Sequence, residues 1–249
     1  MKGKRILLVE DNEINRLLAN TILTQYGADI TEAANGDIAI NILGDNSFDL
    51  ILMDVQMPVK GGIETTMYIR SHIDTSIPII ALTANAFKSE EVKCLQAGMN
   101  DFITKPFDEH KIVSVVTQWL GREVDIPVTV NEKLAENRKL IDLGLLESVS
   151  RGKKDFVKKM LDLFIESTPA MFNEMQQSHK EQDWKNLRAL AHRMKASVHV
   201  LGITAIDQNL DGIEYSDNDE PDKDEIDEHM HRIKFVLSEL KREIKAFFK

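Results

Sequence analysis

The stretch FDLILMD, residues 48–54, is an apolar run that ends in the carboxylate of Asp54. A second stretch, RILLV at residues 5–9, has the same form and is followed by Glu10 and Asp11. Short, almost fully apolar runs are typical of strands that are buried on both faces of a parallel sheet. Because the carboxyl ends of parallel strands meet, we expect the three carboxylates at the sheet edge where open α/β sheets bind ligands.

Strands and helices alternate through the first half of the chain. We predict strands at residues 4–9, 28–33, 48–54, 77–83 and 101–104, and helices at residues 12–26, 36–43, 63–71, 89–97 and 108–120. Such alternation with short connections predicts an α/β fold, a doubly wound five-stranded parallel sheet with helices on both faces. Gly27, Gly44 and Gly98 follow predicted helices, where a left-handed C-cap is expected.

The second half has helical periodicity and no alternating strands. Apolar residues at helical spacing mark three faces: Phe156, Met160 and Leu163; Leu187, Leu190, Met194 and Leu201; and Ile226, Met230, Ile233, Leu237, Leu240, Ile244 and Phe247. Helices that each bury one face indicate an all-α, antiparallel helical bundle. Pro169 should end or kink the helix that carries the first face, and Gly202 should end the helix that carries the second.

These patterns divide the chain into an α/β domain at residues 1–121, a linker at residues 122–139 and a helical-bundle domain at residues 140–249. The expected linker is polar, contains Pro127 and has no sustained apolar face.

Composition excludes several classes of protein. The formal net charge of −10 argues against a nucleic-acid-binding surface. Apolar runs of a few residues are far shorter than the roughly 20 that span a bilayer, and Glu10 interrupts the only signal-peptide-like start. The single Cys94 permits no internal disulfide, which suits a reducing compartment. We therefore expect a cytoplasmic protein without nucleic-acid partners or direct membrane contact.

The polar residues at the predicted strand ends suit phosphoryl transfer. Three crowded carboxylates are tolerable when a hard divalent cation lies between them, and Mg²⁺ favours carboxylates, waters and phosphate oxygens. Thr83 ends the fourth predicted strand and Lys105 follows the fifth, so a hydroxyl and an ammonium come to the same edge. A carboxylate nucleophile, a metal, a lysine and a hydroxyl around one point fit phosphoryl transfer, where catalysis is mainly positioning and charge neutralisation.

Four motifs follow one another at four of the strand ends: VEDNEINR at residues 9–16, MDVQMPVKGG at 53–62, ALTAN at 81–85 and TKPF at 104–107. Together they resemble a response-regulator receiver domain. The resemblance covers about the first half of the chain and implies that Asp54 is the phosphoacceptor. It further implies that Asp11, Asp54 and the backbone carbonyl of Gln56 bind Mg²⁺, and that Glu10 assists through water.

The same resemblance assigns roles to the other strand-end residues. It implies that Thr83 and Lys105 hold the phosphoryl oxygens, and that Phe102 is an aromatic switch that responds to Thr83. Lys105-Pro106 is expected to be cis, which would aim the lysine into the site. Asn85 is expected to border the pocket.

His192 stands out in the second half because of its place on a predicted helix. At about 100° per residue, the apolar residues from Leu187 to Leu201 mark the core side, and His192 points nearly opposite, toward solvent. Arg188, Lys195, Ala196 and His199 share its face. A phosphorylated imidazole there would have cations nearby, although a single histidine on a basic helix face is more often a surface residue without chemistry.

The motif around this histidine, LAHRMKASVHVLG at residues 190–202, resembles the active helix of histidine-containing phosphotransfer (Hpt) domains. That family is a four-helix bundle that carries phosphate on histidine and has no kinase activity of its own. The resemblance covers roughly residues 140–249 and implies that His192 is the phosphate carrier, with Lys195 as an electrostatic aid. The family usually has glycine in place of Ala196, and the methyl group here is expected to crowd an incoming receiver.

A receiver followed by an Hpt domain, with no ATP-binding kinase module, resembles the C-terminal part of a hybrid sensor histidine kinase or a free-standing relay protein. The implied function is a two-component phosphorelay, in which phosphate passes from a kinase histidine to Asp54, then to His192, then to a downstream response regulator. The implied partners are the phosphoacceptor domain of the upstream histidine kinase and the receiver of that regulator. A membrane-anchored kinase would carry these domains on its cytoplasmic tail.

Other classes fit part of the pattern. A response regulator whose helical half is a protein-binding output domain would leave His192 unphosphorylated, and this alternative stays open. A haloacid-dehalogenase-type phosphatase also uses an aspartate nucleophile, but it needs a second aspartate two positions later, where this chain has Gln56. A dinucleotide-binding enzyme is excluded because no glycine-rich loop follows the first strand.

Overall fold

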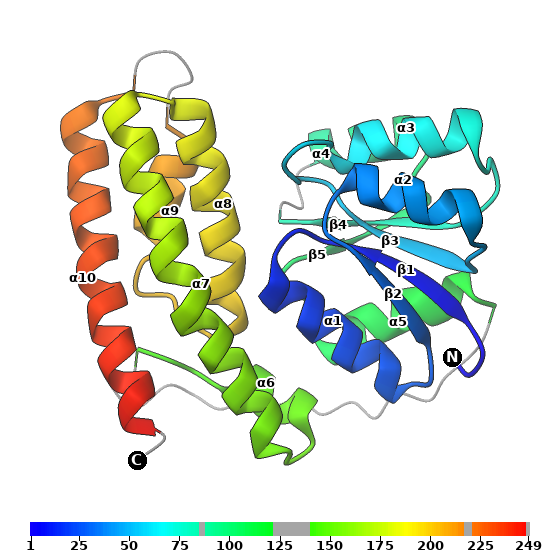
Figure 1. Cartoon of the computed structure of the whole chain (residues 1–249), viewed down its shortest axis with the longest axis horizontal. Coiled ribbons are helices and arrows are strands. Elements are labelled where there is room, and N and C mark those ends of the chain that lie inside the picture. Colours follow the sequence, from blue (N-terminus) through cyan, green and yellow to red (C-terminus); the bar gives the residue numbers. More distant parts are fainter. Residues whose placement is uncertain (85–87, 122–139, 217–220, 248–249) are drawn as a thin grey trace. The chain divides into compact units, whose positions relative to one another are not determined.

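The computed structural model describes residues 1–84, 88–121, 140–216 and 221–247, and the chain divides into two compact units, Met1–Lys133 and Leu134–Lys249 (Figure 1). Both units contain buried apolar side chains, so each has a core of its own. The linker expected at residues 122–139 and the pocket-edge residue Asn85 lie outside the described residues.

The first unit is a five-stranded parallel sheet in the order β2-β1-β3-β4-β5. Its strands are β1 (Arg5–Val9), β2 (Asp29–Ala33), β3 (Leu50–Asp54), β4 (Ile79–Thr83) and β5 (Asp101–Thr104). Its helices are α1 (Glu13–Gln25), α2 (Gly36–Asp45), α3 (Gly62–His72), α4 (Lys88–Gln96) and α5 (Glu109–Trp119). Figure 1 shows α2, α3 and α4 on one face of the sheet and α1 and α5 on the other. The doubly wound fold predicted from the alternating pattern is confirmed.

The inner strands explain the apolar runs in the sequence. Every side chain of β3 and of β4 is buried, because helices cover both faces of the sheet at these positions. In the edge strand β2, by contrast, Ala33 is the one buried residue. The parallel register sets Val9 of β1 beside Met53 of β3, so Glu10, which follows β1, and Asp54, the last residue of β3, lie at the same edge of the sheet.

Polar caps explain where several helices begin. Asn12, Asn35, Asp108 and Asp183 each accept a hydrogen bond from a backbone N–H in the first turn of the helix that follows. At the other ends, Gly27 and Gly98 have the expected left-handed backbone, with φ of +81° and +99°. The same expectation for Gly44 was wrong, because α2 continues through it to Asp45.

The second unit is a helical bundle. Its helices are α6 (Gly144–Ser150), α7 (Lys154–Glu181), α8 (Trp184–Val200), α9 (Asp207–Glu214) and α10 (Lys223–Phe247). Helix α7 contacts α8 and α10, and the short α9 contacts α8 and α10. Gly202 follows α8 with φ of +62°, as predicted for the end of that helix.

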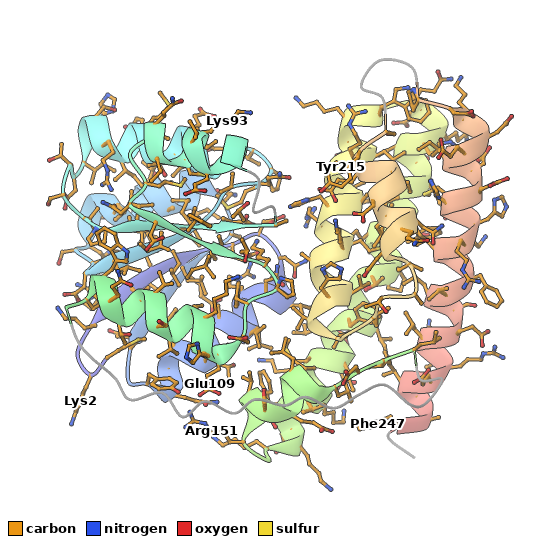
Figure 2. The ribbon with its side chains drawn as sticks, turned by 180° about the vertical axis from the view of Figure 1, so that it is seen from behind. Lys2, Lys93, Glu109, Arg151, Tyr215 and Phe247 are labelled. Carbon is orange, nitrogen blue, oxygen red and sulfur yellow. The ribbon has the colours of Figure 1, made fainter. Side chains whose placement is uncertain are left out.

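Several details of the bundle differ from the sequence prediction. Pro169 lies inside α7 and does not end it, and the alternative that it kinks this helix stays a prediction. Phe156 and Leu163 are only partly buried. Phe247, in the last turn of α10, is 59% exposed (Figure 2). Among the helices that the structure describes, none has the length and apolarity that a membrane span requires.

Candidate functional site

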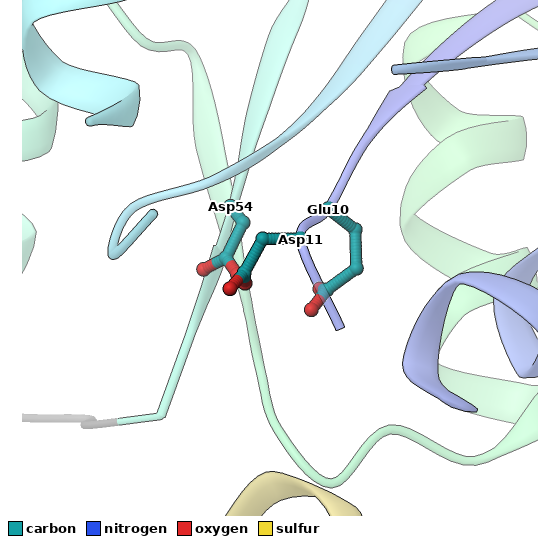
Figure 3. Close-up of side chains that lie close together, drawn as sticks. All are labelled: Glu10, Asp11 and Asp54. Atoms are coloured by element: carbon teal, nitrogen blue, oxygen red, sulfur yellow. The ribbon is translucent and has the colours of Figure 1, made fainter. Parts of the chain in front are cut away.

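The carboxylates of Glu10, Asp11 and Asp54 lie close together at the carboxyl edge of the sheet (Figure 3), and this cluster is called the acidic pocket below. One carboxylate oxygen from each residue lies within 4.8 Å of the others. Glu10 and Asp54 are 1% and 3% exposed, and Asp11 is partly buried. The convergence follows from topology, since β1 and β3 are neighbours in the sheet.

Lys105 supplies a positive charge to this pocket. Its Nζ lies 2.6 Å from Oε2 of Glu10 and 2.7 Å from Oδ2 of Asp54, and its side chain is 7% exposed. Burial disfavours the ammonium, but the charges of Asp54 and Glu10 outweigh burial and raise the pKa of Lys105 above its ordinary value. Burial raises the pKa of Asp54 well above its ordinary value, and the charge of Glu10 adds to this, while Lys105 opposes both.

Backbone and amide donors orient the carboxylates. Oε1 of Glu10 accepts hydrogen bonds from the backbone N–H of Asn12 at 3.3 Å and from Nδ2 of Asn15 at 3.2 Å. Oδ1 of Asp54 accepts a hydrogen bond from the backbone N–H of Gln56 at 3.2 Å. The role expected for the Gln56 carbonyl as a metal ligand stays a prediction.

The other predicted residues of this half lie on β4 and β5. Thr83 ends β4 and is 4% exposed, and its carbonyl accepts a hydrogen bond from the N–H of Lys105 at 2.7 Å. Phe102, on β5, is partly buried and packs against the hydrophobic core. The Lys105–Pro106 peptide bond is cis, as expected.

The oxygen atoms of the acidic pocket are of the kind that bind a magnesium ion. Magnesium prefers carboxylate and other oxygen ligands, and this pocket provides three carboxylates. Lys105 offsets one of their negative charges, so the pocket keeps an excess of negative charge that a divalent cation would neutralise.

His192 is placed differently from the sequence prediction. The expectation that it points to solvent was wrong: its side chain is 7% exposed, and its Nδ1 lies 2.7 Å from Oε1 of Glu214 on α9. Two residues of the face predicted to be basic and solvated pair with acidic residues of α9. Lys195 bonds to Asp211 and lies 3.4 Å from Glu214, and His199 bonds to Asp207 at 3.0 Å.

The electrostatics of this pair assign the tautomer of His192. Burial opposes the charge of Glu214, but the hydrogen bond and charge of His192, together with Lys195, lower the pKa of Glu214. An ionised carboxylate only accepts hydrogen bonds, so Nδ1 of His192 carries the hydrogen. Within the described residues this is the hydrogen bond that the His192 side chain makes. In the neutral imidazole with hydrogen on Nδ1, Nε2 is the nitrogen that carries the lone pair.

Glu214 is a residue of this site that the sequence prediction missed. It ends an eight-residue helix that was not predicted, and it stands 22 positions from His192 in the sequence. The spacing of Leu210 and Ile213, both buried, was the available signal for α9, but it is too short to identify a helix by periodicity.

The family comparisons agree with this geometry. Residues 6–117 match the model of the response regulator receiver domain, and residues 159–242 match the model of the Hpt domain. This chain is a receiver domain joined to an Hpt domain. It therefore belongs to the two-component phosphorelay proteins.

Two relatives that match most of this chain are named as sensor proteins. The chain is 33% identical over 210 residues to the sensor protein GacS of Pseudomonas syringae pv. syringae, a match that covers 81% of this chain and 23% of GacS. It is 27% identical over 211 residues to the aerobic respiration control sensor protein ArcB of Escherichia coli K12, covering 82% of this chain and 26% of ArcB. The chain thus spans about a quarter of the length of these relatives.

The receiver domain also has relatives among solved structures. It is 40% identical to the receiver domain of the sensor histidine kinase PA1611 from Pseudomonas aeruginosa PAO1, which was crystallised with a magnesium ion in its active-site cleft. That match covers 48% of this chain and 99% of the other, with a TM-score of 0.46.

Proposed function

We propose that this chain carries two consecutive steps of a phosphorelay. Asp54 of the receiver domain accepts a phosphoryl group from a phosphohistidine of an upstream kinase, and His192 of the Hpt domain takes it from Asp54. The proposal rests on the two reacting groups that one chain presents, a buried aspartate beside Lys105 and a histidine whose Nδ1 is held by Glu214. His192 then donates the group to the receiver of a separate response regulator.

The first step forms an aspartyl phosphate. A carboxylate oxygen of Asp54 attacks the phosphorus of the donor phosphohistidine, the P–N bond breaks as the P–O bond forms, and the donor imidazole leaves with the electron pair. In this proposal Lys105 and Thr83 bind the phosphoryl oxygens; the 2.7 Å distance between Nζ of Lys105 and Asp54 supports the role of the lysine. Asp11, Asp54 and the Gln56 carbonyl would hold Mg²⁺, and Glu10 would act through water. When bound, Mg²⁺ supplies charge neutralisation for the crowded oxygens.

The second step moves the group to the Hpt domain. Nε2 of His192 attacks the phosphorus, and the carboxylate of Asp54 leaves as the P–O bond breaks. The imidazole gains positive charge as the P–N bond forms, and the carboxylate of Glu214, 2.7 Å from Nδ1, stabilises that charge. Lys195 lies beside the same carboxylate and adds a second cation near the phosphoryl group.

The relatives suggest the setting of these steps. GacS and ArcB are sensor proteins of which this chain matches a part, so we propose that the chain acts as the relay segment of a hybrid histidine kinase or beside a separate kinase. The phosphoacceptor domain of that kinase and a downstream receiver are the proposed partners, and the cytoplasm is the proposed location.

A labelling experiment tests the proposal. Wild type, Asp54→Asn and His192→Gln are incubated with a cognate kinase, radiolabelled ATP and Mg²⁺, and the bound label is tested in alkali and in acid. Wild type should gain an alkali-stable, acid-labile label, His192→Gln an alkali-labile label alone, and Asp54→Asn none. Full labelling of Asp54→Asn by the kinase would overturn the order of transfer. An alkali-labile label alone in wild type would make the helical domain an output module.

A further inference from the structure

Arg16, on α1, binds the turn that carries two of the three carboxylates of the acidic pocket. Its Nη1 donates a hydrogen bond to the backbone carbonyl of Glu10 at 2.7 Å and a longer one to the carbonyl of Asp11 at 3.4 Å. These carbonyls belong to the residues immediately after β1, where the chain leaves the sheet. The guanidinium therefore holds the backbone of the pocket and does not compete for its carboxylates.

The other side of the guanidinium is anchored on the neighbouring strand. Nε of Arg16 lies 3.1 Å from Oε2 of Glu32, whose other oxygen accepts a hydrogen bond from Asn20 on α1. Glu32 stands on β2, directly beside Leu8 of β1. The planar guanidinium thus connects the exit of β1 to β2 with a fixed geometry, which a flexible ammonium does not provide.

We infer that Arg16 is a positioning residue for the magnesium site of the receiver domain. It holds the backbone of Glu10 and Asp11 so that their carboxylates face Asp54, and Glu32 holds Arg16. The inference rests on the proposed function, because it takes the acidic pocket to be a magnesium site. The simpler alternative is that Arg16 only joins α1 to β2 and acts on the pocket through its charge.

The two roles predict opposite signs for magnesium affinity. A guanidinium near three carboxylates repels a second cation, so removing its charge strengthens magnesium binding if charge is its whole effect. If Arg16 holds the backbone in place, removing it weakens binding, because the carboxylates lose their orientation before the ion arrives. Removing the anion Glu32 does not separate the roles by itself, because loss of its charge and loss of positioning both weaken binding. The double variant separates them, because independent charge effects add and two residues that act as one unit do not.

The experiment measures magnesium binding directly, by titration calorimetry on the full chain. Positioning predicts that Arg16→Gln weakens binding about tenfold, the lower end for residues that orient metal ligands. It predicts that Glu32→Gln also weakens binding, and that the double variant is no weaker than Arg16→Gln alone, because the two residues act as one unit. Lys4→Gln is the matched control. It removes a cation paired with Asp49 at the opposite end of β1, and should leave the affinity unchanged.

Cooperative urea unfolding without magnesium checks that every variant is folded. If Arg16→Gln is not folded, Arg16→Lys carries the test: it keeps the charge and loses the planar guanidinium, so positioning predicts weaker binding and charge alone predicts unchanged binding. Binding by Arg16→Gln as tight as wild type, or tighter, would overturn the inference while leaving the magnesium site intact. The inference would also be overturned if Arg16→Gln and Glu32→Gln changed the magnesium affinity in opposite directions and the two changes added in the double variant. A wild type that binds no magnesium would overturn the proposed metal site itself, and this inference with it.

Discussion

The hydrogen bond between Glu214 and His192 should control the rate of the second transfer step. We consider two substitutions, Glu214→Gln, which keeps an oxygen acceptor, and Glu214→Ala, which removes it. Both side chains are less than a tenth exposed, at 8% and 7%, so solvent screens the interaction weakly. The interaction strengthens as the imidazole gains positive charge, and its loss should therefore appear in the rate of transfer.

The size of the effect follows from the bond that is lost. A hydrogen bond to a charged group contributes about 1.5–3 kcal/mol, and a neutral one about 0.5–1.5 kcal/mol. Glu214→Gln should therefore lose about 1–1.5 kcal/mol of transition-state stabilisation and slow transfer roughly tenfold. Glu214→Ala should lose the whole contribution, which corresponds to a rate about 10- to 150-fold lower.

The assay is rapid-quench measurement of the alkali-stable label after Asp54 has been loaded. Loading of Asp54 serves as an internal standard, because Glu214 lies in the other domain. Glu174→Gln is the control: Glu174 is an exposed residue of α7, and its substitution should leave the transfer rate unchanged. Transfer rates within twofold of wild type for both Glu214 variants would refute the role assigned to this carboxylate.

Three further predictions concern stability. Gly62→Ala should lower the free energy of unfolding of the receiver domain in urea by about 1–3 kcal/mol, because the new Cβ would lie 2.1 Å from the carbonyl oxygen of Asp54; an unchanged midpoint would contradict this. Val59→Asn should raise that free energy by about 0.5–1 kcal/mol, since Val59 is 82% exposed and has φ of +69°, where asparagine is less strained; a loss of stability would count against it. The pKa of Glu214 is lowered from its ordinary value of 4.5 in the folded protein, so the ionised side chain stabilises the fold at pH values above 4.5. This stabilisation is lost as the pH falls through the lowered pKa. The difference in unfolding free energy between wild type and Glu214→Gln should accordingly be larger at about pH 6 than at about pH 3.5, and a difference that grows on acidification would contradict the assignment.

The receiver half could be predicted closely because its signals are local. Each inner strand is a short apolar run, and the strand ends deliver their carboxylates to one edge by topology alone. Besides the end of α2 at Gly44, the clearest errors lie at strand starts: the strand predicted from residue 77 begins at Ile79, after Pro78, which has no N–H for the ladder. Similarly, β3 begins at Leu50, two residues after the predicted start.

The Hpt half was predicted less well because its site depends on packing between helices. Periodicity gives the direction of His192 relative to its own helix, but it does not say which neighbour covers that direction. The covering element is α9, a helix of eight residues, and its carboxylates pair with the residues expected to form a free basic face. Glu214 could therefore be found only from the folded structure.

A chase experiment tests whether one phosphoryl group moves from Asp54 to His192. Wild type is labelled briefly by the kinase, the kinase and ATP are removed, and alkali-labile and alkali-stable label are followed with time in Mg²⁺. Transfer from Asp54 to His192 predicts that the alkali-labile label falls as the alkali-stable label rises by the same amount, and that His192→Gln shows no such rise. Loss of the alkali-labile label to inorganic phosphate alone, with no alkali-stable label formed, would contradict the account.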